Sequence, residues 1–270
     1  MRATSGSAAA DARLLLAFVL GCDRDDLIVA DERELSAAQL MQVEALVAER
    51  ALGVPVAYLI GEAWFYGRPF EVTRDVLVPR PETEHVVEAA LDDLRARSRR
   101  KPRVVDVGTG SGAIGVTLAC ELPEISVIAT EISAPALAVA RRNARRHAVE
   151  KRCSLLQGDL LEPLGPDAAI DCVVANLPYV PTAEVPGFPN PVAHEPLVAV
   201  DGGPDGLDPY RRLLAQLPAV AAPGASVFLE AAPPTIERLA ELVERALPKA
   251  HVEIVDDYAG LDRFLAISLP

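Results

Sequence analysis

The sequence predicts an α/β protein: a doubly wound, mostly parallel β-sheet preceded by a small helical N-terminal domain and a β-hairpin linker. Three observations support this fold class. From about residue 81 onward, apolar strand-like segments alternate with helical segments, which is typical of a parallel sheet covered by helices on both faces. The first 55 residues place apolar side chains at helical spacing. Residues 56–80 contain short apolar runs separated by glycines, which favours a hairpin.

Bulk composition restricts the class of protein. The chain has 270 residues, of which 50% are hydrophobic, enough for a large domain and a small accessory domain. No apolar run reaches eighteen residues, so no membrane span is expected. The four cysteines and four histidines are dispersed, which argues against a metal site or a disulfide framework and favours reduced thiols in the cytoplasm. The net charge of −13 argues against DNA or RNA as the main partner.

The predicted N-terminal domain, residues 1–55, contains three helical segments. Asp11–Leu20 places apolar residues, including Phe18, on one side, and a short segment at 25–29 has a similar bias. Ser36 opens a longer helix that ends before the next glycine and proline.

In the predicted linker, residues 56–80, we expect strands at Ala57–Ile60, at Trp64–Tyr66 and within Phe70–Val78, with turns at the intervening glycines. The stretch Pro79–Glu84 closes this hairpin and leads into a helix.

The main domain is predicted to span residues 81–270. Strands are expected at Arg103–Val107, Ser126–Glu131, Ser154–Gln157, Ile170–Ala175, Ala225–Glu230 and Val252–Asp256, the last continued by Arg263–Ser268. Helices are expected at about 113–122, 134–148, 209–219 and 234–247. Ligands of such sheets bind at the carboxyl ends of the strands, so the residues that follow each strand are the candidates for a site.

The first of these strands runs into a glycine-rich turn and then a helix. A nicotinamide cofactor would normally require G-x-G-x-x-G with room for a pyrophosphate. Here Asp106 precedes the first glycine, and a carboxylate beside the loop suits a cofactor that carries an ammonium and a sulfonium group, because opposite charges attract. The arrangement resembles the first motif of class I methyltransferases, which implies S-adenosyl-L-methionine as the cofactor. The loop residues expected to contact it are Gly108, Thr109, Gly110, Ser111 and Gly112.

Two further carboxylates follow the next two strands. Glu131 ends the second strand, where it can accept hydrogen bonds from both ribose hydroxyls. Asp159 follows the third strand, where it can accept the adenine amino group, with Leu160 flanking the ring. Together with Asp106, they place carboxylates at three successive strand ends and extend the predicted cofactor site.

The fourth strand leads into Asn176-Leu177-Pro178-Tyr179, the N-x-P-Y tetrapeptide of methyltransferases that act on planar amino nitrogens of amides and adenine. The lone pair of such a nitrogen is delocalised, so the site has to supply geometry and hydrogen bonds. We expect the Asn176 side-chain carbonyl and a main-chain carbonyl beside Pro178 to accept the N–H groups, while Tyr179 stacks on the flat group. These three are the predicted catalytic residues. With Leu177 they form the predicted substrate site, and Asn176 is also expected to contact the cofactor. The proline-rich segment 181–204 is expected to shape the substrate entrance.

The combination resembles the protein-(glutamine-N5) methyltransferases, which methylate peptide chain release factors and, in a sister group, a ribosomal protein. The resemblance runs from Val56 to Arg263 and is most specific in Gly61–Gly67 and Val78–Glu84. It implies a class I, Rossmann-like fold with a seven-stranded sheet, a release factor as the protein partner, and an N-terminal domain that recognises it. The family also implies that Leu77 and Arg80 lie near the methyl donor. A monomer is the default expectation.

Three departures keep other interpretations open, one of which is that the helical region ahead of the hairpin is short for the family. Leu177 stands where the family usually has proline, and Ala-Ala-Pro-Pro follows Glu230 where Gly and Gln are expected. A paralogue that methylates another protein or a small-molecule amide is therefore a second interpretation. A nucleic-acid adenine methyltransferase would share the two motifs, but the net charge and the hairpin sequence argue against it. Asp106 argues against a nicotinamide oxidoreductase, and the intact motifs argue against a non-catalytic binding module.

Overall fold

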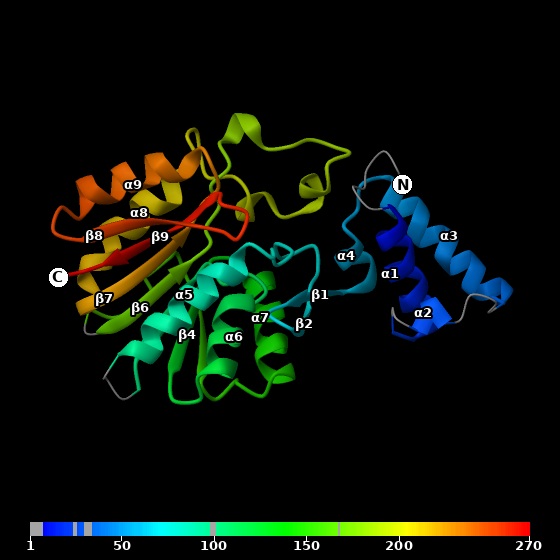
Figure 1. The fold of residues 1–270 in the computed structure, drawn as a ribbon, viewed down its shortest axis with the longest axis horizontal. Coiled ribbons are helices and arrows are strands. Elements are labelled where there is room, and N and C mark those ends of the chain that lie inside the picture. The colour runs from blue at the N-terminus through cyan, green and yellow to red at the C-terminus, as the bar shows by residue number, and fades with distance from the viewer. Residues whose placement is uncertain (1–7, 24–25, 30–33, 98–100, 167) are drawn as a thin grey trace.

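The N-terminal part of the protein is a group of short helices. The computed structural model describes residues 8–23, 26–29, 34–97, 101–166 and 168–270 (Figure 1), so residues 1–7, 24–25 and 30–33 of the predicted N-terminal domain lie outside the described residues. The helices are α1 (Ala8–Leu20), α2 (Asp26–Val29) and α3 (Ala37–Ala51).

Helix α3 begins where the sequence predicted. Ser36 and Gln39 form a reciprocal capping box at its first turn. Near its end, Arg50 pairs with Asp11 of α1 over 2.8 Å. Of the apolar residues predicted to share one side of α1, Leu15 is buried, whereas Phe18 is 46% exposed.

The segment predicted as a strand at Ala57–Ile60 is instead a single helical turn, α4 (Val56–Ile60). The main-chain carbonyl of Pro55 accepts hydrogen bonds from the N–H groups of Tyr58 and Leu59, which starts the turn. Gly61 ends it in a left-handed conformation with a φ of 75°. Five residues of β-branched and aromatic character are too few to reveal a helical period.

The hairpin itself consists of β1 (Glu62–Phe65) and β2 (Arg68–Glu71), paired antiparallel. Tyr66 and Gly67 both have a positive φ at the turn, as a two-residue hairpin requires. The predicted strand does not continue to Val78, because the chain leaves the hairpin after β2 and runs across the edge of the main domain.

The main domain contains the predicted mostly parallel, seven-stranded sheet. Its order is β5-β4-β3-β6-β7-β9-β8, and only β9 runs against its two neighbours. The strands are β3 (Arg103–Val107), β4 (Ser126–Glu131), β5 (Cys153–Gln157), β6 (Ile170–Ala175), β7 (Ala221–Glu230), β8 (His251–Asp256) and β9 (Asp262–Ser268). Each of the first four starts within one residue of its predicted position.

Helices cover both faces of this sheet (Figure 1). One face carries α5 (Thr83–Ala96), α6 (Ala113–Glu121) and α7 (Ala134–Arg146), and the other carries α8 (Asp208–Gln216) and α9 (Thr235–Ala246). Two apolar clusters, one on each side of the strands, form the core. Within the described part of the chain, no helix is long and apolar enough to cross a membrane.

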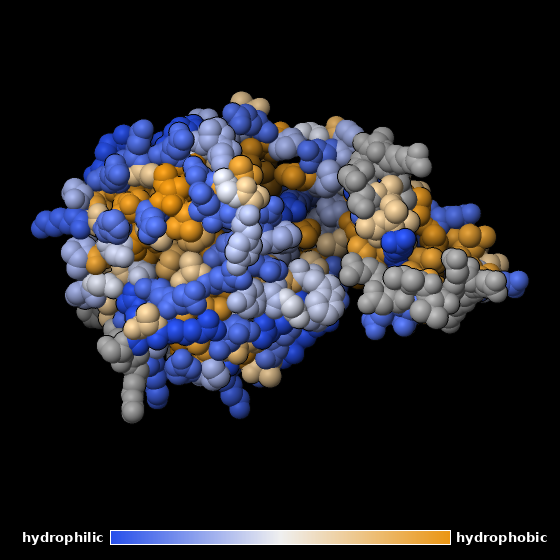
Figure 2. All heavy atoms as spheres, viewed as in Figure 1, coloured by the Kyte–Doolittle hydropathy of each residue, from blue (hydrophilic) through white to orange (hydrophobic). Residues whose placement is uncertain are grey.

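Between β6 and α8 the chain forms a long excursion with three short 3-10 turns, η1 (Thr182–Glu184), η2 (Pro191–His194) and η3 (Leu197–Ala199). In the space-filling view a hollow separates the main domain from the helical N-terminal part, and hydrophobic residues are visible inside it (Figure 2). The carboxyl ends of β3 to β6 lie at one edge of the sheet, because these four strands run parallel to one another.

Candidate active site

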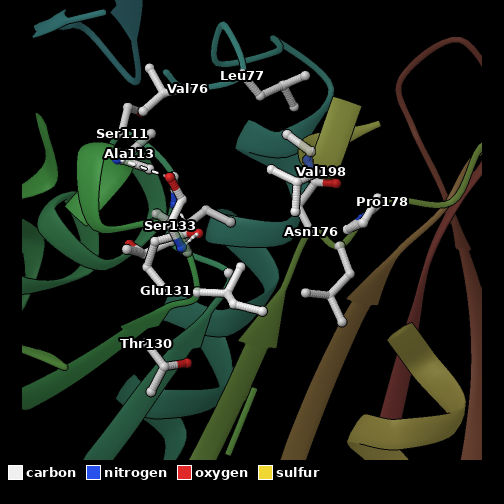
Figure 3. Close-up of a pocket in the computed structure, with 18 of the residues that line it drawn as sticks. Val76, Leu77, Ser111, Ala113, Thr130, Glu131, Ser133, Asn176, Pro178 and Val198 are labelled. Carbon is white, nitrogen blue, oxygen red and sulfur yellow. Dashed lines mark hydrogen bonds between the residues drawn. The ribbon is translucent and has the colours of Figure 1, made fainter. Parts of the chain in front are cut away.

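A cavity lies at the carboxyl ends of β3, β4, β5 and β6. Its free space, open mouth included, is about 1040 Å³, enough for a nucleoside-sized ligand and a second group beside it. In Figure 3, Glu131 and Ser133 lie on one side and Asn176, Pro178 and Val198 on the other, with Leu77 above them. The cavity therefore contains elements of both predicted motifs.

The glycine loop forms one wall of this cavity. Gly108, Gly110 and Gly112 have positive φ angles of 69°, 55° and 84°, which favour glycine. A Cβ atom on Gly108 would lie 2.8 Å from Cδ2 of Leu177. The cofactor loop and the acceptor motif are thus packed directly against each other.

Asp106 lies beneath this loop rather than in the cavity wall. Its Oδ2 accepts hydrogen bonds from the Thr109 hydroxyl over 2.5 Å and from the Gly115 N–H over 2.8 Å. Its Oδ1 has no hydrogen-bond partner among the described residues. Burial raises the pKa of this carboxyl to about 6. The carboxylate shapes the loop directly, and contact with the cofactor ammonium stays a prediction.

Glu131, at the end of β4, borders the cavity. Its two carboxylate oxygens accept hydrogen bonds from the N–H groups of Gly110 and Ser133, each over 2.9 Å. An ionised carboxylate has further lone pairs, so it can still accept from two ribose hydroxyls.

Asp159, which follows β5, also lines the cavity and forms an ion pair with Arg212 of α8. Arg212 is a cavity residue that the sequence motifs did not indicate. Leu160 lines the same region, as predicted for a residue beside the adenine ring.

Asn176 follows β6 and lines the opposite wall. Its Nδ2 donates a hydrogen bond to Oγ1 of Thr83 over 3.0 Å. Of the two main-chain carbonyls beside Pro178, that of Pro178 itself faces Gly202, where a Cβ atom would approach it to 2.7 Å. The carbonyl of Leu177 lies 3.2 Å from the Tyr210 hydroxyl and keeps a second lone pair. Leu177 therefore carries the more available of the two carbonyls.

The remaining wall comes from the segment after the hairpin. Val76, Leu77 and Arg80 line it, and Arg80 forms an ion pair with Glu195 of the segment 181–204. Oε1 of Glu195 also accepts a hydrogen bond from the Val78 N–H over 3.2 Å. This carboxylate thus connects the segment 181–204 to the linker at the cavity.

Most predicted site residues lie together in this cavity. Three do not line it: Asp106, Gly112 and Tyr179. Burial raises the pKa of Tyr179 to about 12, so its phenol stays neutral. The sequence reasoning missed Thr83, Ser133 and Arg212 among the lining residues. Thr83 belongs to the stretch Val78–Glu84, in which the family resemblance is most specific, and this was its one signal in the sequence.

Comparison with known proteins identifies the family. The chain is 42% identical over 257 residues to a release factor glutamine methyltransferase of Moorella thermoacetica, covering 95% of this chain and 90% of the relative. The chain belongs to the release factor glutamine methyltransferase family. The enzyme of the same description from Bacillus subtilis is 40% identical to this family member, covering 93% of this chain and 88% of the relative. Residues 1–61 match the PrmC N-terminal domain, and residues 87–186 match the methyltransferase small domain.

Solved structures share the fold of this release factor glutamine methyltransferase family member. A methyltransferase from Pyrococcus furiosus aligns with a TM-score of 0.54 at 20% identity, covering 83% of this chain and 96% of that one. The hMettl16 catalytic domain, in complex with an RNA hairpin, aligns with a TM-score of 0.55 at 15% identity, covering 84% and 91%. These likenesses establish the class I methyltransferase fold.

The cavity fits S-adenosyl-L-methionine, the methyl donor of such enzymes. The glycine loop leaves open space at Gly110, where a Cβ atom would meet nothing within 4 Å, so a ligand can approach the backbone closely there. Glu131 and Asp159 offer carboxylates to hydroxyl and amino donors, while Ile132, Ala136 and Leu160 supply apolar surface around them. These residues match the polar and apolar parts of an adenosine group.

Proposed function

We propose that this protein transfers a methyl group from S-adenosyl-L-methionine to the side-chain amide nitrogen of a glutamine in a peptide chain release factor. The observation that carries the proposal is that Asn176 and Leu177 line the same cavity as the glycine loop and Glu131. Relatives at 42% and 40% identity bear the name of that activity.

When bound, S-adenosyl-L-methionine supplies a methyl group on a positively charged sulfur. The side chain of Glu131 and the backbone of the loop 108–112 would hold its sugar and amino acid parts. Asp159 and Leu160 would hold its base, and Arg80 would border the reactive end. Asp106 would act from below the loop through its charge.

The acceptor side is built to hold a planar amide. The Oδ1 of Asn176 and the carbonyl of Leu177 would each accept one N–H of the glutamine amide, which turns the face of its nitrogen towards the methyl group. Both oxygens would also stabilise the positive charge that develops on nitrogen. The proton leaves after transfer, so no base has to act first. Pro178 would shape the wall, whereas Tyr179 lies behind it and would act on the acceptor only through the residues that line the cavity.

The domains divide these tasks. We assign residues 1–55 to recognition of the release factor, residues 56–80 to a linker, and residues 81–270 to catalysis. The hollow between the two parts, in which hydrophobic residues are visible, supports a protein-sized partner (Figure 2). We propose that the enzyme acts as a monomer in the cytoplasm, where release factors work, and that it does not bind nucleic acid directly.

The test is transfer of labelled methyl from S-adenosyl-L-methionine. The purified protein is incubated with release factors, with release factors whose acceptor glutamine is replaced, and with total RNA, and the label is located by mass spectrometry. We expect label on a single glutamine, lost in the substituted release factor. Label on RNA adenine, or none on any release factor despite tight donor binding, would overturn the proposed acceptor.

A further inference from the structure

Asn176 is held by a polar side chain outside its own motif. Thr83, the first residue of α5, accepts the hydrogen bond from Nδ2 of Asn176 over 3.0 Å. Thr83 is only 4% exposed and lines the cavity. Thr83 also lies beside the carboxyl group of Glu230, the last residue of β7, and lowers the pKa of that carboxyl. Thr83, at the start of α5, is therefore bonded to Asn176 after β6 and lies next to Glu230 at the end of β7.

The chemistry of these groups fixes the direction of each bond. A hydroxyl has one hydrogen to donate, whereas an ionised carboxylate can only accept. The Thr83 hydroxyl can therefore donate to the neighbouring Glu230 carboxylate, and its oxygen presents a lone pair to Asn176. Only the NH2 end of the Asn176 amide can bond to that lone pair. Its carbonyl is consequently turned away from Thr83 and available to a donor in the cavity.

Glu230 occupies a position where a carboxylate is costly. The residue is 1% exposed, and its Oε2 has no hydrogen-bond partner within the part of the chain that the structure describes. The two nearby cations are paired elsewhere, Arg80 with Glu195 and Arg263 with Asp257. A buried carboxylate with so few hydrogen bonds and ion pairs destabilises the folded state. Its presence here therefore points to a role in function.

We propose that Thr83 and Glu230 are positioning residues for methyl transfer, which orient the Asn176 amide so that its carbonyl oxygen faces the acceptor nitrogen. This inference rests on the proposed function. It assigns Glu230 no contact with substrate or cofactor, since the carboxylate acts through Thr83 and Asn176.

The orientation depends on the charge of Glu230. Burial raises the pKa of this carboxyl to about 7. Once protonated, the acid can donate its own hydrogen to Thr83, whose hydroxyl is then free to donate to the Asn176 oxygen, and the amide turns its NH2 end towards the cavity. Methyl transfer should therefore fall as the pH drops through about 7. The ionisable groups that face Glu230 are Arg80, Glu82, Tyr179, Tyr210 and Arg263.

The kinetic test compares three variants of the full-length chain. Thr83→Val keeps the shape of the side chain but removes its hydroxyl, and Thr83→Ser keeps the hydroxyl. Thr117→Val is the matched control, because Thr117 is a fully buried threonine in α6 whose hydroxyl has no partner among the described residues. With release factor as acceptor, Thr83→Val should lower kcat roughly 10-fold or more and flatten its pH profile. Its affinity for S-adenosyl-L-methionine should stay within about 2-fold. Thr83→Ser and Thr117→Val should behave like the unmodified protein.

A second readout needs no acceptor. The side-chain NH2 signals of Asn176, assigned by their loss in Asn176→Asp, should shift with pH around a midpoint near 7 in nuclear magnetic resonance spectra. Thr83→Val and Glu230→Gln should both abolish that shift. Because the two substitutions are at different positions, misfolding of one variant leaves the other as a test.

An unchanged kcat in a folded Thr83→Val protein would overturn the positioning role. The same holds if the Asn176 signals change neither with pH nor with these substitutions. Failure of the unmodified protein to label any release factor would instead overturn the proposed function, and the spectra would still decide the orientation of Asn176.

Discussion

Asn176 and Glu131 border one cavity from opposite sides but are expected to serve different ligands. One Nδ2 hydrogen of Asn176 is engaged by Thr83, so the amide oxygen is turned towards the acceptor. Both carboxylate oxygens of Glu131 accept backbone hydrogen bonds, one from the glycine loop and one from the start of α7. Glu131 therefore fixes the position of the loop in the cofactor site. Substitutions at the two positions should therefore separate catalysis from donor binding.

Replacing Asn176 with Ala should lower kcat by roughly 100-fold, because a hydrogen bond that strengthens with the charge on nitrogen acts mainly in the transition state. The dissociation constant of S-adenosyl-L-methionine, measured by calorimetry, should change by less than about 3-fold. Equal losses in rate and donor affinity would contradict this role.

Glu131→Ala should show the opposite pattern. Removal of the carboxylate deletes hydrogen bonds to ribose and frees the Gly110 and Ser133 N–H groups, so donor affinity should fall roughly 10-fold or more. Glu124→Ala, at an exposed position before β4, is the control and should leave affinity unchanged. If Glu131→Ala binds S-adenosyl-L-methionine with unchanged affinity, Glu131 only holds the glycine loop in place and does not bind the donor.

At the scale of elements, the segment 181–204 is attached to the linker through Glu195. This residue is 7% exposed, and burial raises the pKa of its carboxyl against the opposing effect of Arg80. One side chain thus fastens a segment of short turns to the wall of the cavity, next to the side where Val198 and Ala199 line it.

Glu195→Ala should therefore loosen that segment. We expect faster amide hydrogen exchange in peptides covering 181–204 and a higher KM for the release factor, because the acceptor must order the segment on binding. Glu184→Ala, at an exposed position in the same segment, should change neither quantity. Identical exchange in the two variants would argue that other contacts hold the segment.

How far the sequence predicts each element depends on its length and surroundings. The strands β3, β4 and β6 are mostly apolar and mostly buried, and their bounds were predicted without error. Helix α4 was not predicted, because a run of five apolar residues fits both a helix and a strand. Only the flanking Pro55 and Gly61 decide that a helical turn forms. In the same way, the glycine loop and Asn176 belong to local motifs, whereas Thr83 and Arg212 reach the cavity from distant parts of the chain.

For the whole molecule, the buried carboxylates make stability depend on pH. The pKa of Glu230 is raised from its ordinary 4.5 to about 7, so the native state binds its proton more tightly than the unfolded state. The unfolding free energy contributed by this group is therefore highest at acidic pH and falls as the pH rises from about 4.5 to about 7.

Glu230→Gln should remove that contribution. Relative to the unmodified protein, the variant should gain up to about 3 kcal/mol of unfolding free energy between pH 5 and pH 8, from a shift of roughly 2.5 pH units at about 1.36 kcal/mol each. Urea unfolding at the two pH values measures the difference. If the unfolding free energy changes equally with pH in both proteins, the pKa of the Glu230 carboxyl is not raised in the folded state.

The position of β9 also matters while the chain is being made. Because β9 lies between β7 and β8, those two strands leave the ribosome before the strand that joins them exists, and they do not pair with each other. One edge of β7 therefore stays open, with its backbone N–H and C=O groups unpaired, until residues 262–268 have been added. An open edge of this kind invites pairing with other chains. A nascent or truncated chain that lacks this one segment should thus depend on chaperones far more than the finished enzyme does.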